Sequence, residues 1–258
     1  MSILDPEYIL YAFLVFVRVG GLITAAPFYE QKFIPVKIKV LFGISVAYVL
    51  VGLVPRPEGL PITEPVALAY YVTIELLTGV VIGFAARFMF FAIRFAGEFI
   101  GFQMAISISQ VISPVDGQSS NPISNLLMMA FTLVFLLLDG HHHLFRALVF
   151  SYDVIPLTGA NLANPGNMML TWTGELFVIA IRLAAPFMIT IFLVDMTLGI
   201  FARVAPQTEI FSMSLSLKLV VGSFLLFLYM KNFFPVMPDL VDQMGEDLLS
   251  IIEALSPL

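Results

Sequence analysis

The sequence predicts an all-α membrane protein made of long, kinked helices and helical hairpins. Hydrophobic residues make up 60% of the 258 residues and charged residues only 12%, and the mean hydropathy is +1.00. Soluble domains contain about 25% charged residues. Apolar stretches close to the length that crosses a hydrocarbon core, about 20 residues, recur along the chain between clusters of Pro and Gly. Together these observations place the chain in the helical membrane class.

Formal charges interrupt almost every long apolar stretch. The stretches and their charges are Tyr8–Ala26 with Arg18, Pro65–Ile93 with Glu75 and Arg87, Gly174–Ala202 with Glu175, Arg182 and Asp195, and Glu209–Phe234 with Lys218 and Lys231. A charge at the centre of a bilayer costs about 2.5–3.5 kcal/mol on the insertion scale. We therefore expect these side chains to face protein or water instead of lipid.

The first two helices are set by prolines. Asp5 can cap a helix that begins at Pro6 and ends near residue 25, because Pro suits the first helical turn. A loop over 27–35, with a proline at each end, separates it from a second helix over 36–53. The acidic opening of the chain does not resemble a cleavable signal peptide.

The third helix follows a loop over 55–65 that contains four prolines and a glycine. It is expected to begin near Glu64 and to run for about 30 residues. Gly79 and Gly83 form a small-xxx-small pair on it, which permits close approach of a second helix. In the continuation of this helix, Arg94 and Glu98 are four residues apart, so an ion pair between them is sterically available.

The second half of the chain is expected to contain a further series of helices. They are predicted at 124–138, in a short helix that follows the histidines 141–143 and ends near 150, at 168–202 with Pro186 as a kink, and at 209–234. The segment 156–167 is rich in Pro, Gly and Asn and is the best internal boundary. The tail carries five acids and no base (Asp239, Asp242, Glu246, Asp247 and Glu253), which predicts a solvated amphipathic end.

Charge patterning limits topology and partners. The one basic stretch contains Lys32, Lys37 and Lys39, and it favours a cytoplasmic location for the connection 28–39. A net charge of −6 without a basic cluster argues against nucleic acid as a partner. The absence of cysteine excludes disulfides and thiolate sites.

Polar residues gather in the segment 107–122, which also contains several turn formers. Non-helical backbone at membrane depth is tolerated only where protein encloses it or where it lines a wet cavity. Two interpretations stay open at this point. The segment is either an ordinary exposed loop or an insertion into a pore.

No catalytic constellation is recognisable. The chain has no phosphate-binding Gly-rich loop, no HExxH motif and no GxSxG elbow. Three adjacent histidines, 141–143, cannot all bind one metal from a helix because neighbours diverge by about 100°. No metal site or cofactor is therefore expected.

One rival function is a secondary transporter with a coupling carboxylate at Glu75, Glu98 or Asp195, although no internal repeat supports it. Another is a membrane scaffold without a pore.

Three motifs together carry a resemblance to a known family. They are GEFIGFQM at 97–104 followed by SISQVISPVDGQSSNPIS, then LLLDGHHHLFRALVFSYDVIP at 136–156, and APQTEIFSMSLSLKL at 205–219. In order, spacing and length the chain resembles the FliR/SctT family of type III secretion export-gate subunits. The segment PVDGQSSNPISN favours the flagellar branch over the virulence-secretion branch.

Departures from the family pattern lie mainly in the third motif. Pro206, Gln207, Phe211 and Lys218 match it, whereas the family often has other residues at Glu209, Ser214 and Ser216. Ala105 also stands where the family often has Gly. These changes affect the detailed role of that stretch and leave the resemblance of the whole chain intact.

The resemblance implies a gated conduit instead of an enzyme. Such proteins are single-copy subunits that assemble with FliP-like and FliQ-like chains, and with an FlhB-like subunit, in the bacterial inner membrane of the flagellar basal body. Unfolded flagellar proteins would pass through the pore. The fold would be a FliP-like unit over 1–160 fused to a FliQ-like hairpin over 161–258, within a helical hetero-oligomer in contact with membrane lipid.

The same resemblance assigns roles to particular residues. The pore plug and constriction would comprise Gln103, Met104, Ser107, Ser109, Gln110, Pro114, Asp116, Gly117, Asn121 and Pro122. Close helix packing would use Gly79, Gly83, Gly97 and Gly101. Polar contacts within the chain or between subunits would use Arg87, Arg94, Glu98, Pro206, Gln207, Phe211 and Lys218.

Overall fold

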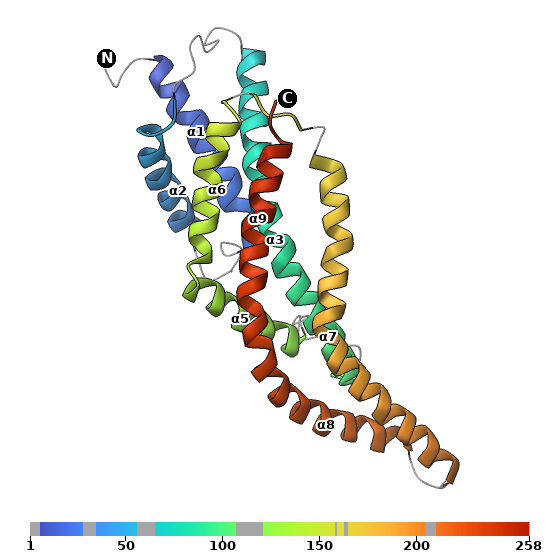
Figure 1. Ribbon diagram of the computed structural model, residues 1–258. Helices are drawn as coiled ribbons and strands as arrows, with labels where there is room; N and C mark the ends of the chain where they lie inside the picture. The colour runs from blue at the N-terminus through green and yellow to red at the C-terminus, as the bar shows by residue number, and fades with distance from the viewer. Residues whose placement is uncertain are drawn as a thin grey trace. The chain divides into compact units, whose positions relative to one another are not determined.

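The computed structural model describes residues 6–27, 35–55, 65–106, 121–157, 159–162, 165–204 and 210–257 (Figure 1). Within these ranges the chain is helical apart from short turns, and no strand occurs, which confirms the predicted all-α class. The helices are α1 (Pro6–Ala25), α2 (Val36–Val51), α3 (Pro65–Gln103), α5 (Pro122–Leu137), α6 (Gly140–Val154), α7 (Pro165–Val204), α8 (Ile210–Phe233), the 3₁₀ turn η3 (Phe234–Val236) and α9 (Met237–Ala254).

The helix boundaries follow the breakers that the sequence contains. α1 begins at Pro6, α3 at Pro65 and α5 at Pro122, each with proline in the first turn, where its missing N–H is not needed. α3 runs for 39 residues, longer than the predicted 30, because no proline follows until the helix has ended.

The acidic tail is a helix that packs on the protein. Four of its acids are exposed, as an amphipathic end requires, but Met244, Leu248, Ile251 and Leu255 are buried on its opposite face. The predicted amphipathic character of the tail is confirmed. Its apolar face is buried against protein, so the tail is not a freely solvated end.

Four helical segments within the described ranges are long and apolar enough to cross a membrane (6–25, 65–103, 166–204 and 213–254), and the pair α5 and α6 together passes as a fifth, broken span. This number fits a multi-pass membrane protein.

Packing divides the chain into two compact units. The first comprises residues 1–88, 139–172 and 241–258, and the second comprises 89–138 and 173–240. α3, α7 and α9 each contribute residues to both units. This division by packing is separate from the family-based division at 160/161, which stays a prediction.

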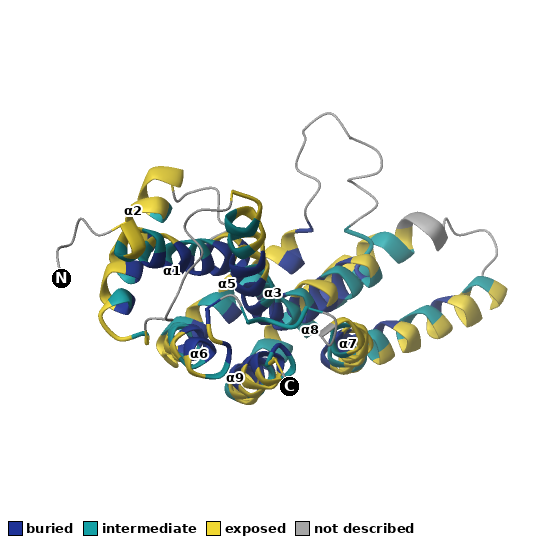
Figure 2. Ribbon diagram, turned by 90° about the horizontal axis from the view of Figure 1, so that it is seen from above, coloured by how far each residue is buried: buried dark blue, intermediate teal, exposed yellow. Residues whose placement is uncertain are grey.

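The first unit has a dense core built on α1. Leu14, Val15 and Val19 on this helix are fully buried, and Figure 2 shows the continuous buried face of α1. α2 lies beside α1, where the hydroxyl of Tyr11 donates to the carbonyl oxygen of Val54 at 2.6 Å and shares its proton with that of Val51 at 3.2 Å. These contacts tie the first half of α1 to the end of α2.

In the second unit, aromatic rings join α3 to α5, and a hairpin of α7 and α8 is more open. Phe90 stacks edge-on against Phe131 and Phe135, with ring centroids 4.9 and 5.4 Å apart. The hydroxyl of Tyr229 on α8 donates to the carbonyl oxygen of Leu183 on α7. Exposed residues are frequent along this hairpin (Figure 2).

Candidate functional site

The charge within the first helix forms a buried, bidentate ion pair. Arg18 and Glu75 are both fully buried. Nε of Arg18 donates to Oε2 of Glu75 at 2.7 Å, and Nη2 donates to Oε1 at 3.1 Å. This fork-to-fork geometry is the strongest arrangement that a guanidinium and a carboxylate can adopt.

The remaining donors of Arg18 are satisfied by α6 and the turn after it. Nη1 donates to the carbonyl oxygens of Ser151 at 3.0 Å and Ile155 at 3.2 Å, and Nη2 also donates to Ile155 at 3.2 Å. All five guanidinium N–H groups thus have an acceptor. The Arg18 Cζ atom lies 4.3 Å from the centroid of the Tyr152 ring, an attractive cation–π contact.

This cluster joins three helices at one point. The hydroxyl of Tyr152 on α6 donates to the carbonyl oxygen of Val15 on α1 at 3.0 Å, next to the ion pair that joins α1 to α3. Sequence reasoning noted both charges but did not pair them. The signal that could have paired them is that Arg18 is the one cation in the first apolar helix and Glu75 is the one anion in the apolar part of the third. Because Glu75 neutralises Arg18, its carboxylate acts here as a structural partner.

Small residues let α1 and α3 approach closely beside this ion pair. A Cβ on Gly79 would overlap the carbonyl oxygen of Arg18, and one on Gly83 would lie 2.6 Å from the carbonyl oxygen of Leu22. From the opposite side, a Cβ on Gly21 would lie 2.5 Å from the carbonyl oxygen of Leu76. The small-residue pair Gly79 and Gly83 therefore lies where the backbones of α1 and α3 are in direct contact.

The glycines at 97 and 101 lie against the start of α5. A Cβ on Gly97 would overlap the backbone of Ser124, and one on Gly101 would overlap the side chain of Asn121. Asn121 also caps α5, because its Oδ1 accepts from the N–H of Ile123 at 3.0 Å, and its Nδ2 donates to the carbonyl oxygen of Gly97 at 3.4 Å. Pro122 follows as the first helical residue. The end of α3 and the start of α5 are thus tied together.

The end of α3 is closed by a Schellman motif. The N–H of Ile106 donates to the carbonyl oxygen of Gly101 at 3.2 Å, and the N–H of Ala105 donates to that of Phe102 at 3.0 Å. The motif needs a left-handed residue, and Ala105 has φ of 61°. Glycine adopts this conformation without the steric cost that a Cβ brings. Ala105 therefore holds a left-handed backbone conformation that glycine, the residue often found there in the family, adopts without strain.

Met104 packs inside the protein at the end of the same helix. Its side chain is buried, and a Cβ on Gly222 of α8 would lie 2.7 Å from its Cγ. Gln103, the residue before it, is half-buried. In this chain alone Met104 contacts α8, so its role in a constriction stays a prediction.

The polar residues expected at contacts lie in different surroundings. Lys218 forms an ion pair with Asp195, with Nζ 2.7 Å from Oδ1, and their side chains are 20% and 38% exposed. Arg94 is exposed, while Arg87 and Glu98 are half-buried. Within the described residues no ion pair joins Arg94 to Glu98, although their spacing permits one.

Much of the predicted plug lies outside the described residues. These positions are Ser107, Ser109, Gln110, Pro114, Asp116 and Gly117, together with Pro206 and Gln207 of the third motif. Phe211 lies in the first turn of α8. Their predicted roles are untested by the geometry.

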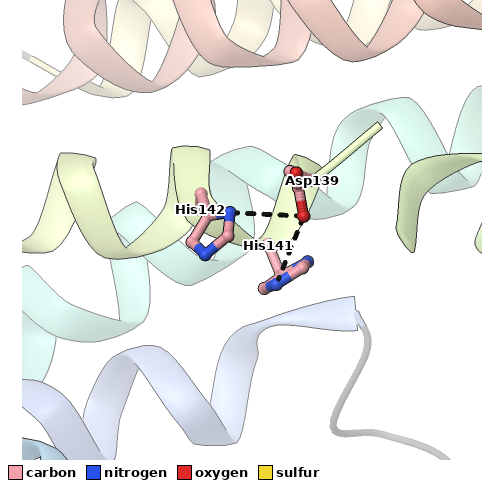
Figure 3. A group of neighbouring side chains, drawn as sticks. All are labelled: Asp139, His141 and His142. Carbon is pink, nitrogen blue, oxygen red and sulfur yellow. Dashed lines mark ion pairs between the residues drawn. The ribbon is translucent and has the colours of Figure 1, made fainter. Parts of the chain in front are cut away.

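A group of potential metal ligands lies where α5 ends and α6 begins (Figure 3). Oδ1 of Asp139 is 3.4 Å from Nδ1 of His142 and 3.9 Å from Nε2 of His141, and all three ligand atoms lie within 4.8 Å of one another. The prediction from sequence considered the three histidines and omitted Asp139. His143 instead points to α9, where a Cβ on Gly245 would lie 2.8 Å from its Nδ1.

This group does not have the geometry of a formed metal centre. Tetrahedral zinc places its ligand atoms about 3.3 Å apart, whereas the carboxylate oxygen of Asp139 lies 3.4 Å from His142 but 3.9 Å from His141. Asp139 and His142 are more than half exposed. The arrangement is accounted for by contacts between a surface carboxylate and two imidazoles, so we assign no metal role to it.

Comparison with known proteins identifies the family. The family model described as bacterial export proteins, family 1, matches residues 9–244. The flagellar biosynthetic protein FliR of Bacillus subtilis is 31% identical over 242 residues, 91% of each chain, and that of Escherichia coli is 29% identical over 92% and 91% of the two chains. The surface presentation of antigens protein SpaR of Shigella sonnei is 27% identical over 83% of this chain. With 236 of its 258 residues under the model, this chain belongs to the bacterial export proteins of family 1.

Proposed function

We propose that this protein is a subunit of the flagellar type III protein export gate in the bacterial inner membrane. With FliP and FliQ homologues, and beside an FlhB-like subunit, it would form a gated pore for unfolded flagellar proteins. One observation carries the proposal: the FliR proteins of Bacillus subtilis and Escherichia coli align with nine-tenths of this chain at 29–31% identity. The segment PVDGQSSNPISN favours the flagellar branch over the virulence branch.

The surface of the α7–α8 hairpin supports assembly with other chains. Of the apolar windows in 166–204 and 213–254, only 28% and 6% are buried within this chain, against 56% for α1. Phe192, Ile200, Phe224 and Phe227 are more than half exposed. The hairpin also carries the ion pair of Lys218 and Asp195, which lipid would disfavour. Neighbouring protein subunits can cover both the apolar and the polar residues.

The anchoring of the polar segment supports a plug. Asn121 contacts Gly101 and bonds to Gly97, so the end of α3 and the start of α5, which flank residues 107–120 in the sequence, are tied together. A plug between two helix ends fixed in this way would open a pore without movement of the helices that carry it. Gln103, Met104 and the segment to Pro122 would form the constriction. The units 1–160 and 161–258 would correspond to FliP-like and FliQ-like parts.

The proposal assigns no catalysis to this chain. Energy for export would come from other components, because the sequence contains no nucleotide-binding motif. The names of the relatives favour export over the transporter alternative. Two of the carboxylates that the alternative required, Glu75 and Asp195, are also engaged by Arg18 and Lys218.

The test is native mass spectrometry of the tagged full chain, expressed with and without its FliP-like and FliQ-like partners. We expect one copy of this chain in a larger hetero-oligomer when the partners are present. A stable monomer or homodimer that ignores the partners would contradict the proposal.

A second test addresses the plug within this assembly. Deletion of residues 110–120 is expected to raise the resting permeability of reconstituted gates to small solutes, measured by conductance. Unchanged permeability, with the hetero-oligomer intact, would refute the plug while leaving the assembly role in place.

A further inference from the structure

A cavity opens between α1 and α2, near the end of α1. Its volume is about 430 Å³. Four apolar side chains form its wall: Phe16 and Ile23 from α1, and Val36 and Val40 from α2. All belong to the first packing unit, so the cavity is a feature of one compact body.

Two cations line the same cavity. Lys39 comes from the first turns of α2 and Arg87 from the middle of α3. Both side chains are half-buried, so neither is fully solvated. No carboxylate lines the cavity within the described residues. An apolar wall with two positive charges matches an amphipathic anion, one that carries a hydrocarbon chain and a phosphate.

Two glycines give the cavity its space. A Cβ on Gly20 would meet nothing within 4 Å, so this face of α1 borders open room. A Cβ on Gly43 would come to 3.4 Å from Ile23 and 3.7 Å from Phe16, in ordinary contact with the apolar wall. A larger side chain at Gly20 or Gly43 would fill part of the cavity, because glycine contributes only backbone to its wall.

The position of the cavity fits a membrane surface. It lies at the last turns of α1 and the first turns of α2, and residues 28–35 join these two helix ends. The stretch 28–39, which comprises this connection and the start of α2, carries three Lys and one Glu, and such an excess of Lys indicates the cytoplasmic side, whose leaflet carries anionic lipids. Basic pockets between membrane helices on that side are suited to phospholipid headgroups.

We propose that this cavity binds one anionic phospholipid, with an acyl chain against Phe16 and Val40 and its phosphate between Lys39 and Arg87. The proposal needs only a membrane location and is independent of the export role. A lipid held there would fill the gap between α1 and α2 and place an anionic group beside Lys39 and Arg87. Its occupancy would then depend on the charge of the headgroup.

The experiment is native mass spectrometry of the full chain in detergent, with phosphatidylglycerol or phosphatidylcholine of the same acyl chains added in a titration. We expect one phosphatidylglycerol to stay bound at collision energies that remove phosphatidylcholine. Lys39→Gln and Arg87→Gln should each weaken its binding about fivefold, the effect of one cation near an anionic surface. Lys37→Gln, an exposed cation two residues away, should leave it unchanged.

A steric variant tests the acyl-chain part without touching charge. In Gly20→Leu the new side chain projects into the cavity without meeting other atoms near its Cβ, and leucine is a good helix former, so the fold should be preserved. It should abolish retention of the lipid. Gly174→Leu, at another helical glycine with nothing within 4 Å, should retain it.

The outcomes separate the sources of the anion. Equal retention of both lipids, or full retention in Gly20→Leu and Lys39→Gln, would overturn the proposal. Displacement of the lipid by inorganic phosphate at millimolar concentration would do so too, because it would indicate a site for a free anion. A partner chain that protects the cavity and excludes lipid in the assembled complex would assign the cavity to protein contact instead.

Discussion

The first packing unit and the α7–α8 hairpin of the second handle charge in opposite ways. In the first unit, Arg18 and Glu75 are fully buried, and every N–H of the guanidinium has an acceptor within that unit. In the hairpin, Lys218 and Asp195 form a single contact and stay partly exposed. The first arrangement is complete within the chain, and the second leaves room for further partners.

The difference also holds for apolar surface. In α1, just over half of the residues in the most apolar window are buried within the chain. In the segment 213–254, only 6% of the corresponding window is buried. The first unit therefore behaves as a folding core, while the hairpin supplies surface for lipid or other subunits. Mutations that weaken the core should affect stability, and mutations on the hairpin should affect assembly.

The largest expected effect comes from breaking the buried ion pair. Glu75→Ala leaves the guanidinium of Arg18 buried without its counter-charge, which should lower the free energy of unfolding by about 3–5 kcal/mol. Thermal unfolding of the purified chain in detergent measures this. The matched variant Asp195→Ala breaks the half-exposed pair and should cost no more than about 1 kcal/mol. Equal losses in the two variants would contradict the contrast between the units.

A smaller loss is expected from separating α1 and α3. In Gly79→Ala the new Cβ overlaps the carbonyl oxygen of Arg18, and both partners are backbone, so the helices must move apart. Overpacking of this kind costs about 1–3 kcal/mol. Gly174→Ala, on an open face of α7, should be neutral or slightly stabilising. A drop in melting temperature for Gly174→Ala as large as that for Gly79→Ala would show that the close approach is not the cause.

In the second unit, loss of the cap on α5 should have a moderate effect. Asn121→Ala removes the acceptor for the N–H of Ile123 and the bond to Gly97, which should cost about 1 kcal/mol. Asn121→Ser retains a capping oxygen and should recover most of the loss. If thermal unfolding gave the same melting temperature for both variants, the capping role would be wrong.

The smallest effect has the opposite sign. Ala105→Gly relieves the left-handed backbone at the end of α3 and should stabilise the protein by about 1 kcal/mol. The same substitution at Ala69, an exposed position inside α3, should destabilise it by about 0.5–1 kcal/mol. Melting temperatures that fell in both variants would show that Ala105 is not strained in solution.

Local sequence signals predict most helix boundaries because they depend on single residues. Pro6, Pro65 and Pro122 each begin a helix, and an uninterrupted apolar run carries α3 to its end. The small-residue spacing at 79 and 83 also shows that a helix can approach there. It does not show which helix does, because the contact depends on the partner's position.

The pairing of charges is the part that sequence reasoning could not supply. Arg94 and Glu98 satisfy the i, i+4 rule but form no ion pair, while Arg18 and Glu75 are 57 residues apart and do. A helix-local rule cannot see a partner on another helix. The same limit explains why Asp139 was not grouped with His141 and His142, since the group depends on the left-handed turn at Asp139.

The sequence by itself determined the membrane class, the order of the helices and, through three motifs, the family. These follow from composition, breakers and residue patterns along one chain. Only the tertiary structure decided that Arg18 is neutralised by Glu75, that Ala105 holds a left-handed turn and that Lys39 and Arg87 share a cavity. Each of these depends on backbone geometry or on distances between residues far apart in sequence, which are fixed only when the helices pack.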